Sequence, residues 1–243
     1  MSSTVLVKAA LFDFDGTLWD PEPHIFQCYQ EVFREYGCGL PSSLWSSVIG
    51  TIGFDLWSHL EVVSGIPVNR NRAEDGVQRR AAALLSALTI RPGIRGVLGA
   101  IDAAGLVRGI VSNSNRSWIR RYATQCGIAD GWRTIHSADG DLALAKPSPH
   151  LYRHALADLG VDAGEALAFE DSPSGIRAAS AAGIRCIAVS NQMTVDLDLS
   201  AADLLVDSYE KIDLSRLLHA GPIRQPNGRD DNAATAHRRR SVC

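Results

Sequence analysis

Two acidic residues one position apart, Asp13 and Asp15, stand at the end of a short apolar run over residues 6–14. Such a run is typical of a fully buried parallel strand. Three other polar segments occupy comparable places further along the chain. Because ligands bind beyond the carboxyl ends of the strands in an open parallel sheet, we expect all of these segments to meet at one edge. The three further segments are Ser112-Asn113-Ser114, Lys146-Pro147 and Glu170-Asp171-Ser172-Pro173.

The acids and the lysine are suited to phosphoryl transfer. Carboxylates that lie close together repel one another, so we expect a divalent cation between Asp13, Asp15 and the Glu170-Asp171 pair. A set of oxygen ligands favours magnesium over zinc. The cation would also offset the negative charge that opposes an incoming phosphate. Lys146 adds a further positive charge for the phosphoryl oxygens and the nucleophile.

Two smaller residues complete the predicted phosphate site. Ser112 and nearby backbone N–H groups can donate hydrogen bonds to a phosphoryl group. Gly16 lets the backbone turn tightly beside the ligand.

The elements that would position these residues alternate between strand and helix. From residue 91 onward, apolar runs alternate with segments of helical spacing that end at glycines. This alternation predicts an α/β fold, a Rossmann-like parallel sheet with helices on both faces. The strands are expected near residues 6–14, 106–111, 134–136, 167–169, 185–189 and 204–206.

Residues 19–90 follow a different pattern. Helices are expected through Tyr36, from Ser42, over 53–63 and over 73–88, and no strand pattern interrupts them. We therefore predict an α/β core made of residues 1–18 and 91–220, with an all-helical cap, 19–90, inserted after the first strand. Residues 221–243 contain almost nothing apolar and are predicted to be a disordered tail.

The composition excludes several classes of partner. The chain has 243 residues, 46% of them hydrophobic, and a net charge of −3, which gives no reason to expect nucleic acid or an anionic membrane. No apolar run approaches the roughly 20 residues that a membrane helix needs, and the N-terminus does not resemble a signal peptide. The five cysteines lack metal-site spacing. We expect reduced thiols in a cytoplasmic protein that is a monomer or a weak dimer.

The four polar segments, taken in order, resemble the motifs of the haloacid dehalogenase superfamily. They are Asp-x-Asp-Gly-Thr after a first strand, Ser after a second, Lys-Pro, and Glu-Asp-Ser-x-x-Gly. The resemblance covers residues 6–218, and the helical insertion matches the family's cap. Residues 146–149 and 170–183 resemble the branch that contains β-phosphoglucomutase and small sugar-phosphate phosphatases.

The resemblance implies a role for each matching residue. Asp13 attacks phosphorus and becomes an aspartyl-phosphate, while Asp15 protonates the leaving oxygen and then activates water. Magnesium lies on the Asp13 side chain, the Asp15 carbonyl and Asp171, with Glu170 bound directly or through another ligand. The phosphoryl group and the acid–base residue are then held by Ser112, Asn113, Lys146, Gly16 and Thr17. The expected substrate is a small phosphorylated metabolite, such as a sugar phosphate.

Two alternatives to a phosphatase remain open. A phosphosugar mutase of the β-phosphoglucomutase type uses a cap histidine, but Ile25 occupies the matching position and His24 is offset by one residue. A non-enzymatic binding protein on the same fold is also conceivable, although such a protein does not need an acid at Asp15. The presence of Asp15 likewise argues against a dehalogenase or a phosphonate hydrolase.

Overall fold

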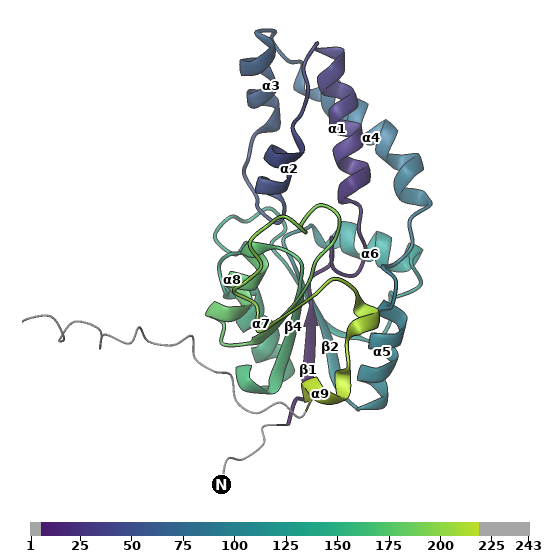
Figure 1. Ribbon diagram of the computed structural model, residues 1–243, viewed down its shortest axis with the longest axis vertical. Coiled ribbons are helices and arrows are strands. Elements are labelled where there is room, and N and C mark those ends of the chain that lie inside the picture. The colour runs from purple at the N-terminus through teal and green to yellow at the C-terminus, as the bar shows by residue number, and fades with distance from the viewer. Residues whose placement is uncertain (1–5, 219–243) are drawn as a thin grey trace, which may run out of the picture.

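The core of the protein is a parallel sheet of six strands in the order β3-β2-β1-β4-β5-β6. The structure is a computed structural model that describes residues 6–218. β1 lies inside the sheet (Figure 1), and its Ala9 is opposite both Val107 of β2 and Ala166 of β4. The strands are β1 (Ala9–Phe12), β2 (Val107–Ser112), β3 (Trp132–Ser137), β4 (Ala166–Glu170), β5 (Arg185–Val189) and β6 (Leu204–Val206).

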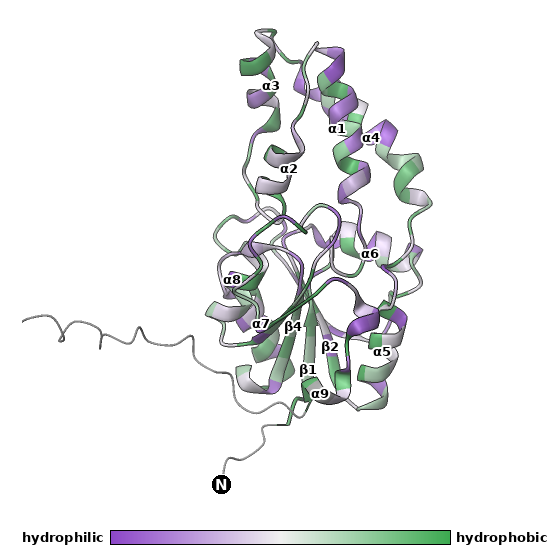
Figure 2. Ribbon diagram, viewed as in Figure 1, coloured by the Kyte–Doolittle hydropathy of each residue, from purple (hydrophilic) through white to green (hydrophobic). Residues whose placement is uncertain are grey.

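Helices cover both faces of this sheet. Successive side chains of a strand point to opposite faces, and Phe12 of β1 packs in one apolar cluster while Leu11 packs in another. Both side chains are fully buried, so the strand must be apolar throughout, as its colour in Figure 2 shows. The predicted fold class is therefore confirmed. The helices are α5 (Ile94–Ala103), α6 (Arg116–Gln125) and α9 (Leu214–Leu218) with the Phe12 cluster, and α7 (His150–Leu159) and α8 (Pro173–Ala181) with the Leu11 cluster.

Four helices between β1 and α5 stand beyond the carboxyl edge of the sheet (Figure 1). Asp55 and Asn69 begin two of them, because the Asp55 side chain accepts hydrogen bonds from two N–H groups of the first turn and the Asn69 side chain accepts one. We refer to these helices and their loops as the cap. They are α1 (Glu22–Glu35), α2 (Ser42–Val48), α3 (Leu56–Ser64) and α4 (Arg70–Ser86).

The chain enters and leaves the cap side by side. Trp19 and Ile90 form an isolated antiparallel bridge. The N–H of Arg91 donates to the carbonyl of Leu18 at 3.0 Å. The two segments that join the cap to the core therefore run next to each other.

The predicted strands differ from the observed ones mainly at their ends. β1 covers only Ala9–Phe12 of the apolar run because the chain turns after Asp13, whereas Leu6 is exposed. β3 extends to Trp132 because that residue pairs with Arg108 at the amino end of β2. Within residues 6–218 no helix has the length and apolar character needed to cross a membrane. The tail predicted at 221–243 lies outside the described residues.

Candidate active site

A cavity of about 160 Å³ lies at the carboxyl edge of the sheet, between core and cap. The core supplies residues from the ends of β1, β2 and β4 and from the loop before α7, and the cap supplies the rest. The sequence pattern thus brings most of the predicted site residues together, as expected for parallel strands that end at one edge. The lining residues are Asp13, Asp15, Ser112, Asn113, Ser114, Lys146, Asp171 and Ser172 from the core, with Glu22, Ile49, Gly50, Thr51 and Ile52 from the cap.

Lys146 is the buried cation of this cavity. Its Nζ lies 2.5 Å from Oδ1 of Asp13 and 2.7 Å from Oε1 of Glu170. The hydroxyl of Tyr152, on α7, donates to the same Glu170 oxygen at 2.6 Å. Burial alone would lower the pKa of the Lys146 ammonium, but the two carboxylates raise it above its usual value. Lys146 therefore stays charged and fixes the Asp13 carboxylate in one orientation.

Three buried carboxyl groups form a cluster beside this lysine. Asp13, Glu170 and Asp171 each offer an oxygen, and these oxygens lie within 4.8 Å of one another. Burial raises the pKa of Glu170 to about 7 and that of Asp171 well above its usual value, and the Asp13 charge adds to both shifts. One ammonium group does not balance three carboxylates in a buried site.

A divalent cation fits this cluster. Oε2 of Glu170 is buried without a hydrogen-bond partner among the described residues, so an acceptor faces no donor. Oδ2 of Asp171 accepts from the side-chain amide of Asn191 at 2.7 Å, which fixes that carboxylate. The donors are all oxygens, the set that magnesium or calcium prefers.

Asp15 is held apart from the cluster by two hydrogen bonds. Its carboxylate accepts from the hydroxyl of Ser114 and, at 2.9 Å, from Nε1 of Trp118. Trp118 lies on α6 and packs against Tyr122 and the buried Trp19. Burial raises the pKa of Asp15 to about 7, against the opposing effect of the two hydrogen bonds. A group with a pKa near neutrality can both donate and accept a proton.

Some predicted phosphate ligands lie elsewhere. Gly16 and Thr17 are buried and do not line the cavity. Gly16 has φ +78°, and a Cβ there would lie 2.0 Å from Oδ2 of Asp171, so the close approach predicted for this glycine is present. The side-chain amide of Asn113 donates to the carbonyls of Gly50 and Lys146, at 3.1 and 3.3 Å.

The cap is fastened to the core at Gly50. Its carbonyl accepts from Ser174 Oγ at 2.6 Å in addition to the Asn113 amide. Its φ is +69°, and a Cβ would lie 2.6 Å from Oγ of Ser172. The loop therefore approaches the start of α8 as closely as only glycine permits.

Several residues of the site were not predicted from the sequence. Asn191 follows β5 by two residues, so the rule that located the other strand ends would have found it. Trp118, Tyr152 and Glu22 lie on helices, where spacing alone does not show that they reach the site. Ser114 stands in a predicted segment, but its bond to Asp15 depends on the turn that follows β2.

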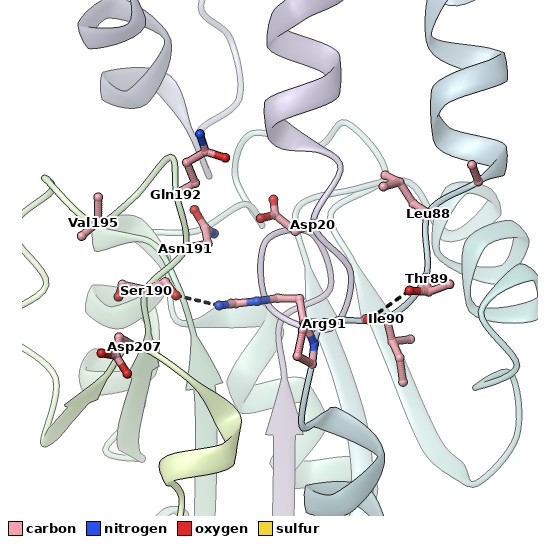
Figure 3. Close-up of a pocket in the computed structure, with 12 residues that line it drawn as sticks. Asp20, Leu88, Thr89, Ile90, Arg91, Ser190, Asn191, Gln192, Val195 and Asp207 are labelled. Atoms are coloured by element: carbon pink, nitrogen blue, oxygen red, sulfur yellow. Dashed lines mark hydrogen bonds between the residues drawn. The ribbon is translucent and has the colours of Figure 1, made fainter.

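A larger cavity, about 560 Å³, opens at the hinge between cap and core (Figure 3). Arg91 extends across it and donates to the carbonyls of Gly16, Val189 and Ser190 at 2.5, 3.0 and 2.6 Å. Asp20 lies on the other hinge segment. The carboxylate cluster is absent from its lining, so the smaller cavity is the better candidate for chemistry.

Comparisons with known proteins agree with this geometry. The family model for haloacid dehalogenase-like hydrolases matches residues 10–189. YhcW of Bacillus subtilis, which carries the name of a phosphatase, is 37% identical over 88% of this chain and 97% of its own length. Hexitol phosphatase B of Escherichia coli is 28% identical over 90% of this chain and 100% of its own. The crystal structure of CbbY from Rhodobacter sphaeroides in complex with phosphate has a TM-score of 0.68 and 26% identity, covering 86% of this chain and 97% of CbbY.

Proposed function

The chain belongs to the haloacid dehalogenase-like hydrolases and is a phosphatase, and we propose that it hydrolyses a small phosphorylated metabolite through a phosphoryl group carried on Asp13. The observation that supports this proposal is the Asp13 carboxylate, which faces the cavity while Lys146 holds it at 2.5 Å. The substrate class is supported by relatives named for phosphatase activity, one of them a hexitol phosphatase. The cavity volume of about 160 Å³ supports a small substrate.

The proposed reaction has two halves. In the first, an oxygen of Asp13 attacks phosphorus, the bond from phosphorus to the ester oxygen breaks, and Asp15 gives its proton to that leaving oxygen. In the second, Asp15 takes a proton from water, the water oxygen attacks the same phosphorus, and inorganic phosphate leaves Asp13. The hydrogen bonds from Ser114 and Trp118 fix the Asp15 carboxyl group, so that it can protonate the leaving oxygen and later take a proton from water.

The residues that would hold a magnesium ion are Asp13, Glu170 and Asp171, and the family resemblance adds the carbonyl of Asp15. When bound, the ion supplies positive charge that offsets the developing negative charge on the phosphoryl oxygens. Lys146 supplies such charge from the protein itself, and Ser112, at the end of β2, lies where it can donate to a phosphoryl oxygen.

The cavity lining does not favour a mutase. A mutase must present a sugar hydroxyl to the phosphorylated aspartate and needs a cap group to move its proton. Neither His24 nor Ile25 lines the cavity. We further propose that the enzyme acts in the cytoplasm, where its buried cysteines Cys28, Cys126 and Cys186 remain free thiols.

The proposal is tested by following both products of an aryl phosphate. We expect purified enzyme to release phosphate from p-nitrophenyl phosphate with magnesium and to lose that activity on chelation. With Asp15→Asn and 2,4-dinitrophenyl phosphate, we expect a burst of phenolate close to one per enzyme, because a good leaving group needs no acid, while phosphate stays on the protein. Activity that survives exhaustive chelation would refute the metal assignment. Phosphate release in step with the burst would refute the covalent intermediate.

A further inference from the structure

Three histidines and an aspartate gather on the outside of the core, where α7 packs against the edge strand β3. The three that lie on α7 recur every four residues, so they share one stripe of the helix. The fourth, on β3, points toward α7, because its pairing partner Val111 packs in the Leu11 cluster with that helix. None of the four lines the catalytic cavity. They are His136 on β3 and His150, His154 and Asp158 on α7.

His136 and Asp158 already lie almost as two ligands of one ion would. Nε2 of His136 is 2.9 Å from Oδ2 of Asp158. Two donors bound to one tetrahedral zinc ion lie roughly 3.4 Å apart, so an ion could take the place of the proton between these atoms. The hydroxyl of Thr134, two residues earlier on the same face of β3, donates to Oδ2 of Asp158 at 3.2 Å and holds the carboxylate there.

Two further imidazoles lie within reach of this pair. The ring centroid of His154 is 6.0 Å from that of His136, and two imidazoles on one tetrahedral ion have centroids about 5 Å apart. His154 is exposed, and exposed side chains change rotamer within nanoseconds, so it can close this distance. The ring of His150 lies 6.3 Å from that of His154 and within 9° of parallel. Nδ1 of His150 is 3.3 Å from the carbonyl oxygen of Ala143, so this ring can carry its proton on Nδ1 and keep the Nε2 lone pair for an ion.

The charge and the donor types of this group also suit a metal. Only the neutral form of histidine offers a lone pair to an ion. Burial lowers the pKa of His136, and the charges of His154 and Arg116 add to this effect against the opposing influence of Asp158. Imidazole nitrogens with one carboxylate favour zinc, nickel or copper over magnesium. The group therefore differs in chemistry from the all-oxygen cluster of the catalytic cavity.

We propose that the outer face of α7 is a second metal site, which binds a transition-metal ion such as Zn²⁺ through His136, His154 and Asp158, with His150 as the fourth donor. The ion ties α7 to β3, a strand that has a neighbour in the sheet on one side only. The opposite side of α7 carries Tyr152, the donor to Glu170. The ion is a structural tie and takes no part in hydrolysis, so this inference does not depend on the function proposed above.

The test measures zinc binding to the full chain, prepared without a histidine tag, by competition with a chromophoric zinc chelator in excess magnesium. We expect His154→Gln and Asp158→Asn to bind zinc at least about tenfold more weakly than the wild type. His59→Gln is the matched control, because His59 lies in the cap against the rings of Phe33 and Phe54, and its affinity should match the wild type. The cysteines and the catalytic acids are common to all four proteins, so a difference between them reports on this site.

Two further measurements test the kind of donor and the structural role. Cobalt(II) bound by nitrogen in a tetrahedral site absorbs strongly in the visible range, whereas six oxygen ligands give weak absorption. We expect the strong absorption in the wild type and in His59→Gln, and its loss in His154→Gln. Zinc should raise the melting temperature of the wild type and leave that of His154→Gln unchanged. Circular dichroism checks the fold of each variant, and their hydrolysis of p-nitrophenyl phosphate should equal that of the wild type.

Each part of the proposal has an outcome that overturns it. Equal zinc affinity in the wild type, His154→Gln and Asp158→Asn would overturn the site itself. Zinc binding that requires these residues but leaves the melting temperature unchanged would overturn the structural tie. A zinc-dependent change in the hydrolysis rate that disappears in His154→Gln would overturn the separation of this ion from catalysis.

Discussion

Replacing Gly50 by alanine should detach the cap loop from the core. Gly50 has φ +69°, and an added Cβ would lie 2.6 and 2.8 Å from Oγ and Cβ of Ser172 and 2.8 Å from Oγ of Ser174. These distances are too short for any real Cβ, so the loop or the start of α8 must move. The same movement would break the hydrogen bonds from Ser174 and Asn113 to the Gly50 carbonyl.

The size of the effect follows from these contacts. A left-handed backbone costs a non-glycine residue about 1–2 kcal/mol. Two lost hydrogen bonds add about 0.5–1.5 kcal/mol each, so the docked loop is destabilised by roughly 2–5 kcal/mol. Since about 1.4 kcal/mol corresponds to a factor of ten, we expect kcat/KM to fall at least ~30-fold if the reaction needs the docked cap.

Gly65→Ala is the matched control. Gly65 lies in the same cap with nearly the same φ, +67°, but nothing lies within 4 Å of an added Cβ. It shares the backbone strain without the clash, so we expect a lower melting temperature but kcat/KM within about twofold of the wild type. The assay is steady-state hydrolysis of p-nitrophenyl phosphate and sorbitol 6-phosphate, with thermal melts of all three proteins. If Gly50→Ala matched Gly65→Ala in kcat/KM, the argument that the docked loop completes the site would be refuted.

Three further predictions concern the acids of the site. Asp13→Asn should lower kcat by at least ~10³-fold, about 4 kcal/mol, while circular dichroism shows the fold retained, because the amide is not a nucleophile; near-normal turnover in a preparation free of deamidation would contradict the mechanism. Gly175→Ala should raise the magnesium concentration needed for half-maximal activity, because its Cβ would lie 1.8 Å from Oε2 of Glu170; an unshifted magnesium titration would count against Glu170 as a ligand. Glu22→Gln should flatten the dependence of the free energy of unfolding on pH. The pKa of Glu22 rises from 4.5 to about 8 on folding, so the stability that its neutral carboxyl contributes is complete below pH ~4.5 and is lost as pH rises through about 8. Parallel denaturant titrations from pH 5 to 8 measure this, and identical slopes for variant and wild type would disprove it.

The sequence predicts the core of this site well because the chemistry follows the strand ends. Asp13, Ser112, Lys146 and Asp171 all line the cavity, and the register of the parallel strands alone brings three of them together. Side chains alternate between the two faces of a strand, and the apolar runs leave no polar face, so the sequence also predicts a sheet that is covered by helices on both faces. The predicted ends of the strands were less accurate, because the ends depend on pairing partners that a single sequence does not show.

Other parts of the site could not be predicted because they depend on side-chain direction and on contacts distant in sequence. Trp118 reaches Asp15 across 103 positions, and its direction is set by its packing on Trp19 and Tyr122. Gly50 meets Ser174 across 124 positions. The first contact lies within the core, between α6 and the loop after β1, and the second joins the cap to the core. No local periodicity encodes where such distant segments meet.

The paired hinge at Trp19 and Ile90 has an evolutionary consequence. Because the chain leaves and re-enters the core at adjacent points, the four cap helices form an insertion that behaves topologically like a single loop. The sheet and its strand ends would close in the same way around a different insertion, provided that Arg91 still joined the ends of β1 and β5. Recombination at these two positions could therefore exchange one recognition module for another while the hydrolytic machinery is inherited intact.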